Sequence, residues 1–233
     1  MNLTYQWLHD TVRARFDSDE TMDAFLPRAL EPEELKRKGD DRYLSAMTQR
    51  IFQAGMRHTV VDARWPAFEE AFSGFAPEAM ARLDEADLVA HMSNQQIIRH
   101  LAKLRTIPRN ARFILDIRRE HGSSFGEFIA AWPVADIIGL WRLLARRGAR
   151  LGGRSGAGFL RLAGKDTFLL TSHVVARLAA AGIITREPTG LRELQVVQDV
   201  FNDLQQRSGR PLCQLSAMLA LSIPPSNPRR FTS

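Results

Sequence analysis

The residues most suited to chemistry lie in a glycine-rich stretch, Arg146 to Gly156, that joins two apolar segments. Glycine lets a backbone turn tightly and approach a phosphate group closely. N–H groups at the start of the next helix are suited to bind an anion, and nearby arginines attract phosphate whatever the base sequence. The glycines stand where a helix–hairpin–helix motif that binds a phosphate backbone would need them. On the turn alone, however, a plain loop with solvated arginines is the favoured interpretation, because glycine-rich turns are common.

The residues that such a motif would place against a nucleic-acid backbone lie within 150–156, with one downstream addition. They are Arg150, Gly152, Gly153, Arg154, Ser155, Gly156 and Lys165.

The elements that must position this turn are helices, because apolar residues recur at helical spacing and only Thr59 to Val61 resembles a strand. Helix starts are expected at Asp41, Pro66, Pro77, Asp84, Ser124 and Asp136. Further helices are expected at about 3–12, 94–121, 155–163, 165–181, 192–208 and 211–222, with a bend or break at Pro108. The pattern predicts an all-α protein of about ten helices, with a mostly irregular segment over 17–38.

Composition narrows the class of protein. The chain has 233 residues, of which 45% are hydrophobic and 25% charged, as in ordinary globular domains. Its single cysteine excludes an intramolecular disulfide and a cysteine-rich zinc cluster. No apolar run approaches the length of a membrane span. We expect a cytoplasmic protein without a membrane partner, and the net charge of +6 fits a polyanionic one.

Several short motifs follow one another in a fixed order. They are Gln53-Ala54-Gly55, the stretch Phe68 to Pro77, Ile97-Ile98-Arg99-His100, Asn110-Ala111-Arg112, Phe159 to Gly164 and Phe168 to Val175. Together, over about 43–181, they resemble the DNA-3-methyladenine glycosylase I family of helix–hairpin–helix DNA glycosylases. The resemblance implies two helical lobes, one over about 41–131 and the other formed by 1–16 with 132–222. It also implies a cleft between the lobes that holds a flipped base, and we expect a mobile tail over 223–233.

The resemblance also implies an activity and a partner. Proteins of this family bend duplex DNA, rotate a damaged nucleotide out of the stack and hydrolyse the glycosidic bond of an alkylated purine. A monofunctional enzyme of this kind leaves an abasic site. We therefore expect a monomer that acts on double-stranded DNA carrying a damaged base, without a cofactor.

The sequence departs from the family at its pocket. The family has a glutamate three residues before Gln-Ala-Gly, and Arg50 stands there in this chain. An arginine cannot accept a hydrogen bond from a protonated purine and repels a cationic base. His58 replaces a pocket tryptophan, while Thr171 and Ser172 stand where the family or its superfamily has aspartates.

Six residues are therefore the candidates for a base pocket: Tyr43, Arg50, Gln53, His58, Thr171 and Ser172. Tyr43 is equally suited to buried packing, and Arg50 to a solvated surface position. Asp40, Asp41 and Asp62 are the acids near the expected pocket wall, and nothing in the sequence chooses among them. Two alternatives stay open: a protein of this fold that binds DNA without cleaving it, and a helical interaction protein with no DNA role.

The zinc site of the family is incomplete here. His173 matches one ligand, but Arg177 stands at the position of a cysteine, and the other two ligands have no counterparts. His173 lies in an apolar segment, where a packing role is expected. Asp166 is expected to cap its own helix. One ligand beside an arginine does not hold Zn²⁺.

We predict that the purified protein carries no structural metal, because its ligand set is broken at Arg177. Elemental analysis should find far less than one zinc per chain. Stoichiometric zinc that survives dialysis against a chelator would contradict this.

Overall fold

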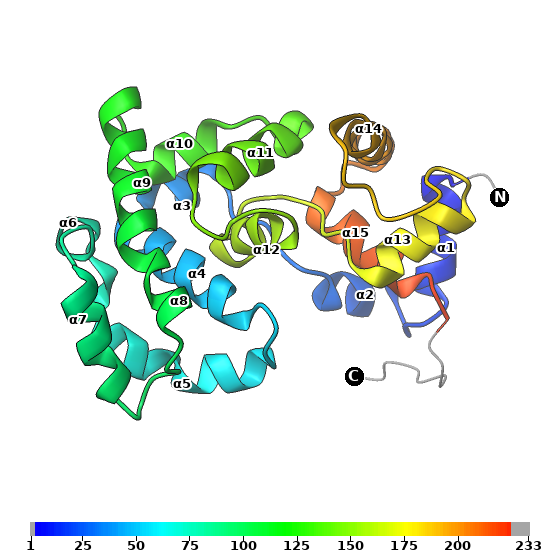
Figure 1. The fold of residues 1–233 in the computed structure, drawn as a ribbon. Coiled ribbons are helices and arrows are strands. Elements are labelled where there is room, and N and C mark those ends of the chain that lie inside the picture. The colour runs from blue at the N-terminus through cyan, green and yellow to red at the C-terminus, as the bar shows by residue number, and fades with distance from the viewer. Residues whose placement is uncertain (1–2, 225–233) are drawn as a thin grey trace. The chain divides into compact units, whose positions relative to one another are not determined.

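The computed structural model describes residues 3–224. Within this range the chain forms α-helices and short 3-10 helices and no strand (Figure 1). In chain order the elements are α1 (Tyr5–Arg13), α2 (Asp19–Phe25), α3 (Pro32–Arg37), α4 (Asp40–Gln53), α5 (His58–Ala71), η1 (Ser73–Phe75), α6 (Pro77–Met80), α7 (Glu85–Ala90), η2 (His91–Ser93), α8 (Leu101–Leu104), α9 (Thr106–His121), α10 (Phe125–Ala131), η3 (Val134–Asp136), α11 (Ile137–Arg147), α12 (Arg154–Ala163), α13 (Ser172–Ala180), α14 (Leu191–Ser208) and α15 (Leu212–Leu221). The predicted all-α class is confirmed, but the prediction of about ten helices was too low. Part of the predicted tail, 225–233, lies outside the described residues.

Helix starts that local chemistry specifies are where the sequence predicts them. Pro77 opens α6. Asp84 and Ser124 form capping boxes at the starts of α7 and α10, each side chain accepting from the backbone N–H three residues later. At Asp84 and Ser124 the local sequence is therefore enough to place the helix start.

Other predicted boundaries were wrong. Pro66 does not open a helix but lies inside α5, which also includes Thr59 to Val61. The helix expected near Asp41 does begin at Asp40, but its N-cap is Gly39 and not Asp41. Residues 94–100 and 165–171 are not helical. The segment 17–38 instead contains two helices, α2 and α3.

The chain divides into two compact units. Within the described residues, unit 1 comprises 3–29, 134–138 and 166–224, and unit 2 comprises 30–133 and 139–165. The predicted lobes differ from this division, since they assigned 139–165 to the lobe that contains the N-terminal helix. That segment includes α12, which packs along α4 and so joins unit 2.

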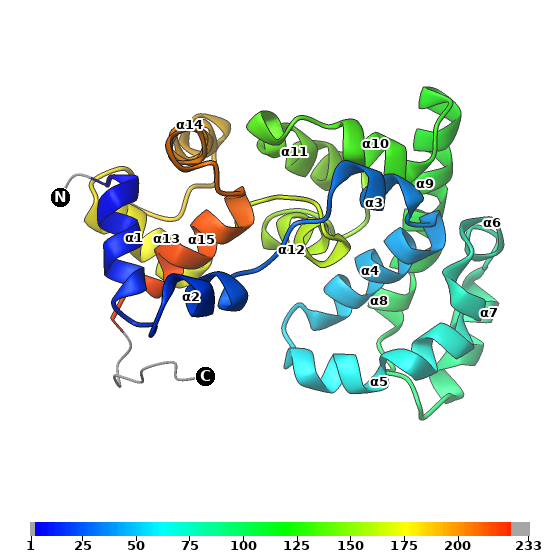
Figure 2. The ribbon, with the colours of Figure 1, turned by 180° about the vertical axis from the view of Figure 1, so that it is seen from behind.

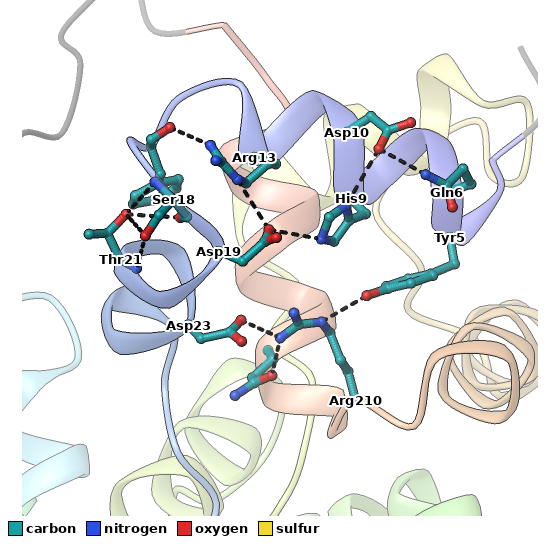
Figure 3. Close-up of polar contacts among 12 residues, drawn as sticks. Tyr5, Gln6, His9, Asp10, Arg13, Ser18, Asp19, Thr21, Asp23 and Arg210 are labelled. Carbon is teal, nitrogen blue, oxygen red and sulfur yellow. Dashed lines mark hydrogen bonds and ion pairs between the residues drawn. The ribbon is translucent and has the colours of Figure 1, made fainter.

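Unit 1 packs α1, α13 and α14 against α15 (Figure 2). Polar contacts tie α1 and α2 to the start of α15 (Figure 3). Arg210 donates to Tyr5 at 2.9 Å and pairs with Asp23 at 2.7 Å, while Arg13 pairs with Asp19 at 3.1 Å.

Unit 2 is built around α4, which packs against α5, α9, α10 and α12. Its buried face includes Tyr43, Leu44, Met47, Ile51 and Phe52. The ring of Phe52 meets Phe68 edge-on at 4.8 Å, and Trp65 stacks on Phe68 at 4.9 Å. The core therefore holds one face of α4, while polar residues of its last two turns lie at the edge.

Basic side chains bind the carbonyl groups at the C-terminal ends of helices. Lys103 donates to the carbonyls of Phe52 and Ala54 at the end of α4, at 3.0 and 2.8 Å. Lys165 binds the carbonyls of Ala130 and Trp132 at the end of α10, and Lys38 binds that of Ala163 at the end of α12. These carbonyls have no hydrogen-bond partner within their own helices, and the cations supply one. The positive charges also interact favourably with the negative ends of the helix dipoles.

No single helix within residues 3–224 is both long and apolar enough to cross a bilayer.

Asp166 caps a helix, but not the one that the sequence suggests. Its carboxylate accepts from the N–H groups of Leu212 and Cys213 at 2.9 and 2.8 Å, and so caps α15. We expect Asp166→Ala to lower the free energy of unfolding by about 1–2 kcal/mol in urea denaturation. The control Asp203→Ala removes only an exposed pair with Arg207 and should cost no more than about 0.5 kcal/mol. Equal losses in the two variants would contradict the cap.

Candidate functional site

The turn between α11 and α12 is fixed from below by a buried amide. The side chain of Asn110 on α9 accepts from the N–H of Ala149 at 2.7 Å and donates to the carbonyl of Ala149 at 3.2 Å. Leu151 is fully buried beneath the turn. A side chain at Gly148 would collide with it, since a Cβ there would lie 2.6 Å from Leu151 Cδ1. The conformation of the turn is therefore fixed by hydrogen bonds and packing.

The tip of the turn is exposed. Arg150, Gly152, Gly153 and Arg154 all lie at the surface. Arg150 and Gly153 both have positive φ angles, 57° and 55°, which bring the chain round to the start of α12. No side chain caps α12. The N-terminal end of that helix and two arginines therefore face solvent together, as backbone binding requires.

Three of the predicted backbone contacts differ in their surroundings. Ser155 is half-buried and Gly156 is buried, and a Cβ at Gly156 would lie 2.6 Å from the carbonyl oxygen of Leu151. Lys165 is only 4% exposed and binds the end of α10, so its prediction as a phosphate contact was wrong. A lysine in a loop looks the same in sequence whether it faces solvent or a helix end.

A polar cluster lies where α4 ends and α5 begins. It consists of Gln49, Arg50, Gln53, His58 and Asp62. Gln49 and Gln53 both donate to Oδ1 of Asp62, at 2.9 and 2.8 Å. No hydrogen bond within the described residues reaches the other oxygen, Oδ2, and Asp62 is exposed. The cluster therefore holds an oriented carboxylate with one oxygen available.

The polar cluster contains three of the six predicted pocket residues, Arg50, Gln53 and His58, and one of the three predicted acids. Gln49 was missed, although its spacing of four residues from Gln53 places both amides on one face of α4. Pro66 lies one turn after Asp62 on α5 and has no N–H. The backbone carbonyl of Asp62 therefore receives no hydrogen bond from position 66.

Arg50 is half-buried in the polar cluster. Its Nη1 lies 3.3 Å from Nε2 of His58, and its buried Nε has no hydrogen-bond partner. Burial lowers the pKa of Arg50, because the charged form loses water. The surface alternative for Arg50 therefore does not describe its surroundings.

Tyr43 does not lie at the polar cluster. It is fully buried, donates to the carbonyl of Leu35 at 2.8 Å and meets Phe125 edge-on at 5.4 Å. Burial, and then the charge of Asp40, raise the pKa of its hydroxyl. The prediction that Tyr43 stacks on a base was wrong, and the packing alternative holds.

The two other predicted acids have structural roles. Asp40 accepts from the N–H of Phe125 at 3.0 Å at the start of α10, and burial raises the pKa of its carboxyl. Asp41 pairs with Arg42 at 2.8 Å. Among the three acids, Asp62 alone accepts a hydrogen bond from a pocket candidate within the described residues, namely Gln53.

Thr171 and Ser172 belong to unit 1. Thr171 is the N-cap of α13 and accepts from the N–H of Val174 at 3.3 Å; both residues are exposed. In the structure they therefore stand at a helix start within unit 1.

The residues at the position of the family's zinc site do not fit a metal. His173 is exposed, so the expected packing role was wrong. Arg177 is 8% exposed, donates to Ser222 Oγ at 2.8 Å and lies over the Trp7 ring at 4.9 Å. A buried cation in this position supports the fold and leaves no place for a cationic metal.

Comparisons with known proteins agree with the motifs. Residues 35–139, just under half of the chain, match the sequence model of the methyladenine glycosylase family. A DNA-3-methyladenine glycosylase of Haemophilus influenzae is 36% identical over 77 residues, which are 33% of this chain and 41% of that protein. The chain thus spans less than half the length of this relative. The resemblance indicated by the motifs is confirmed for this part of the chain.

Solved structures extend the likeness to most of the fold. The 8-oxoguanine glycosylase/lyase of Methanocaldococcus jannaschii, solved with DNA, has a TM-score of 0.54 at 15% identity and covers 92% of this chain and 95% of its own. The 8-oxoguanine DNA glycosylase of Thermotoga maritima has a TM-score of 0.51 at 16% identity and covers 94% and 96%. The chain therefore has the all-α fold of DNA glycosylases.

Reversing the charges at the turn should weaken DNA binding. We expect the double variant Arg150→Glu, Arg154→Glu to bind an undamaged duplex at least about tenfold more weakly at low salt, with the salt-dependence slope reduced by about 2. Fluorescence anisotropy at several salt concentrations measures both quantities.

The matched control reverses two exposed arginines of unit 2 outside the turn, Arg82→Glu with Arg119→Glu. Its net charge equals that of the turn variant. If both variants lose affinity equally, the turn has no specific role.

Proposed function

We propose that this protein is a monofunctional DNA glycosylase of base excision repair, which releases an alkylated purine from duplex DNA. One observation carries the proposal: a compact unit combines an exposed, arginine-bearing helix start with an oriented carboxylate in the polar cluster. The first is suited to a DNA backbone and the second to activation of water. The relative from Haemophilus influenzae is named for 3-methyladenine, which supports an alkylated purine as the substrate.

The turn between α11 and α12 would bind the DNA backbone. Its exposed Arg150 and Arg154 supply charge without reading sequence, and the uncapped start of α12 supplies N–H donors. The neighbour from Methanocaldococcus jannaschii was solved with a 15mer DNA, which supports duplex DNA as the partner.

Hydrolysis would use Asp62. An alkylated purine is a good leaving group because its positive charge weakens the glycosidic bond. Asp62 Oδ2 would accept a proton from water as the water oxygen bonds to C1′ of the sugar. The glycosidic bond breaks with its electron pair leaving on the base, which removes the purine's charge. Gln49 and Gln53 hold the carboxylate in place for this step.

A monofunctional reaction is supported by the state of the lysines. A lyase needs a free amine that forms a Schiff base with the sugar. The chain has four lysines. The ammonium groups of Lys38, Lys103 and Lys165 bind helix-end carbonyls, and Lys36 pairs with Glu33 at 2.7 Å.

A second candidate is a protein that binds damaged DNA without releasing the base. The position of Arg50, where the resemblance places a glutamate, favours it. In that case the polar cluster would recognise a lesion but not activate water.

Base release under single-turnover conditions decides between the two. With protein in excess over methylated duplex, we expect wild type to release methylated purine and to leave abasic sites without strand cleavage. Asp62→Asn should slow release by about 10²-fold or more, because the amide cannot accept the proton.

The control Asp116→Asn removes a surface carboxylate of α9 and should release base at the wild-type rate. Release that is equally fast in Asp62→Asn would exclude Asp62 as the base. No release by wild type, with DNA binding intact, would favour the binding protein.

A further inference from the structure

Arg50 is an unneutralised cation inside the polar cluster. Within the described residues its one polar contact is with His58, and it forms no ion pair with a carboxylate. Its Nε is buried without an acceptor. A cation at the end of α4 favours the helix dipole, but an exposed arginine would do this without loss of hydration. The position therefore suggests a guanidinium that is held ready for an acceptor.

Gly158 fixes where the guanidinium lies. Residue 158 is on α12, which packs along α4, and a Cβ there would lie 2.1 Å from Nε of Arg50. The side chain of Arg50 thus rests directly on the backbone of α12. Replacement of Gly158 by alanine would push the guanidinium away without changing any charge.

The Arg50–His58 pair presents only hydrogen-bond donors. A guanidinium donates and never accepts, so Nε2 of His58 must accept from Nη1 of Arg50. The proton of the neutral imidazole then sits on Nδ1, which makes the second ring nitrogen a donor as well. The acceptors of the polar cluster are elsewhere, on Asp62.

A donor-only surface distinguishes the two kinds of purine. Guanine and other 6-oxopurines offer two neighbouring acceptors, O6 and N7, and a guanidinium can donate to both. Adenine offers N7 as an acceptor but an amino group at position 6, which is a donor. That amino group would face another donor and leave both without partners. In DNA, methylation at N3 makes either base cationic, and release from the sugar removes that charge from both. Charge therefore does not separate the two bases, whereas the O6/N7 edge does.

We propose that Arg50, positioned by His58 and Gly158, selects 6-oxopurine lesions such as 3-methylguanine over 6-aminopurine lesions such as 3-methyladenine. This inference rests on the proposed function, because it takes the polar cluster as the place where the flipped base binds.

Binding of free bases tests the inference without catalysis. Calorimetry or NMR titration should give wild type a Kd for 3-methylguanine at least about tenfold below that for 3-methyladenine, the effect expected of one well-placed donor pair. Arg50→Glu should reverse the order, since a carboxylate accepts from an amino group. Gly158→Ala should reduce the preference to about threefold or less, with all charges kept.

Arg57→Glu is the matched control. Arg57 is exposed at the N-cap of α5, and its substitution makes the same charge change beside the polar cluster. It should keep the preference. Circular dichroism checks that each variant is folded. If Arg50→Glu does not fold, the change in base preference of Gly158→Ala tests the inference in its place.

Base release from methylated duplex, analysed by chromatography of both bases, separates the two proposals. If neither base is released but 3-methylguanine binds better through Arg50, the activity fails and the inference stands. Tighter binding of 3-methyladenine, or a preference that Arg50→Glu leaves unchanged, overturns the inference. Weaker binding of undamaged DNA by Arg50→Glu, with the base preference intact, would make Arg50 a phosphate contact and would also overturn it.

Discussion

Helix ends held by cations are the interaction on which the arrangement of this protein depends. Short helices leave many terminal carbonyls without partners, and each such group costs free energy when it is buried. In unit 2 the ammonium groups of Lys38, Lys103 and Lys165 bind the ends of α12, α4 and α10. In unit 1 the guanidinium groups of Arg15 and Arg177 bind carbonyls at the end of α15.

Lys103 matters most for the site. It binds the carbonyls of Phe52 and Ala54, the two neighbours in sequence of Gln53 in the polar cluster. Burial, and then the charge of Arg150, lower the pKa of its ammonium group, so it is a desolvated cation close to the hairpin turn. Lys103 thereby fixes the end of α4, and with it the positions of Arg50 and Gln53 relative to their partners on α5.

The sequence predicted well what neighbouring residues decide. The capping boxes at Asp84 and Ser124, the proline start of α6 and the glycine turn before α12 all depend on residues within one turn of each other. The collinear motifs likewise predicted that Arg50, Gln53 and His58 belong to one site.

The errors involve contacts between segments that are distant in the sequence. Lys165 binds a helix end more than thirty residues earlier, Asp166 caps a helix more than forty residues later, and Tyr43 is covered by α3 and α10. No local pattern distinguishes such a lysine from a phosphate contact. Asp62 could not be chosen from three acids, because only the packing of α5 along α4 brings it to Gln49 and Gln53.

The most direct test of the account is a crystal structure of the protein with a duplex that carries a methylated purine on a 2′-fluorinated, hydrolysis-resistant sugar. We expect an extrahelical base against Arg50 and His58, with Asp62 Oδ2 within hydrogen-bond reach of a water near C1′ and with phosphates bound to Arg150 and Arg154. An unflipped base, or one bound away from the polar cluster, would contradict it.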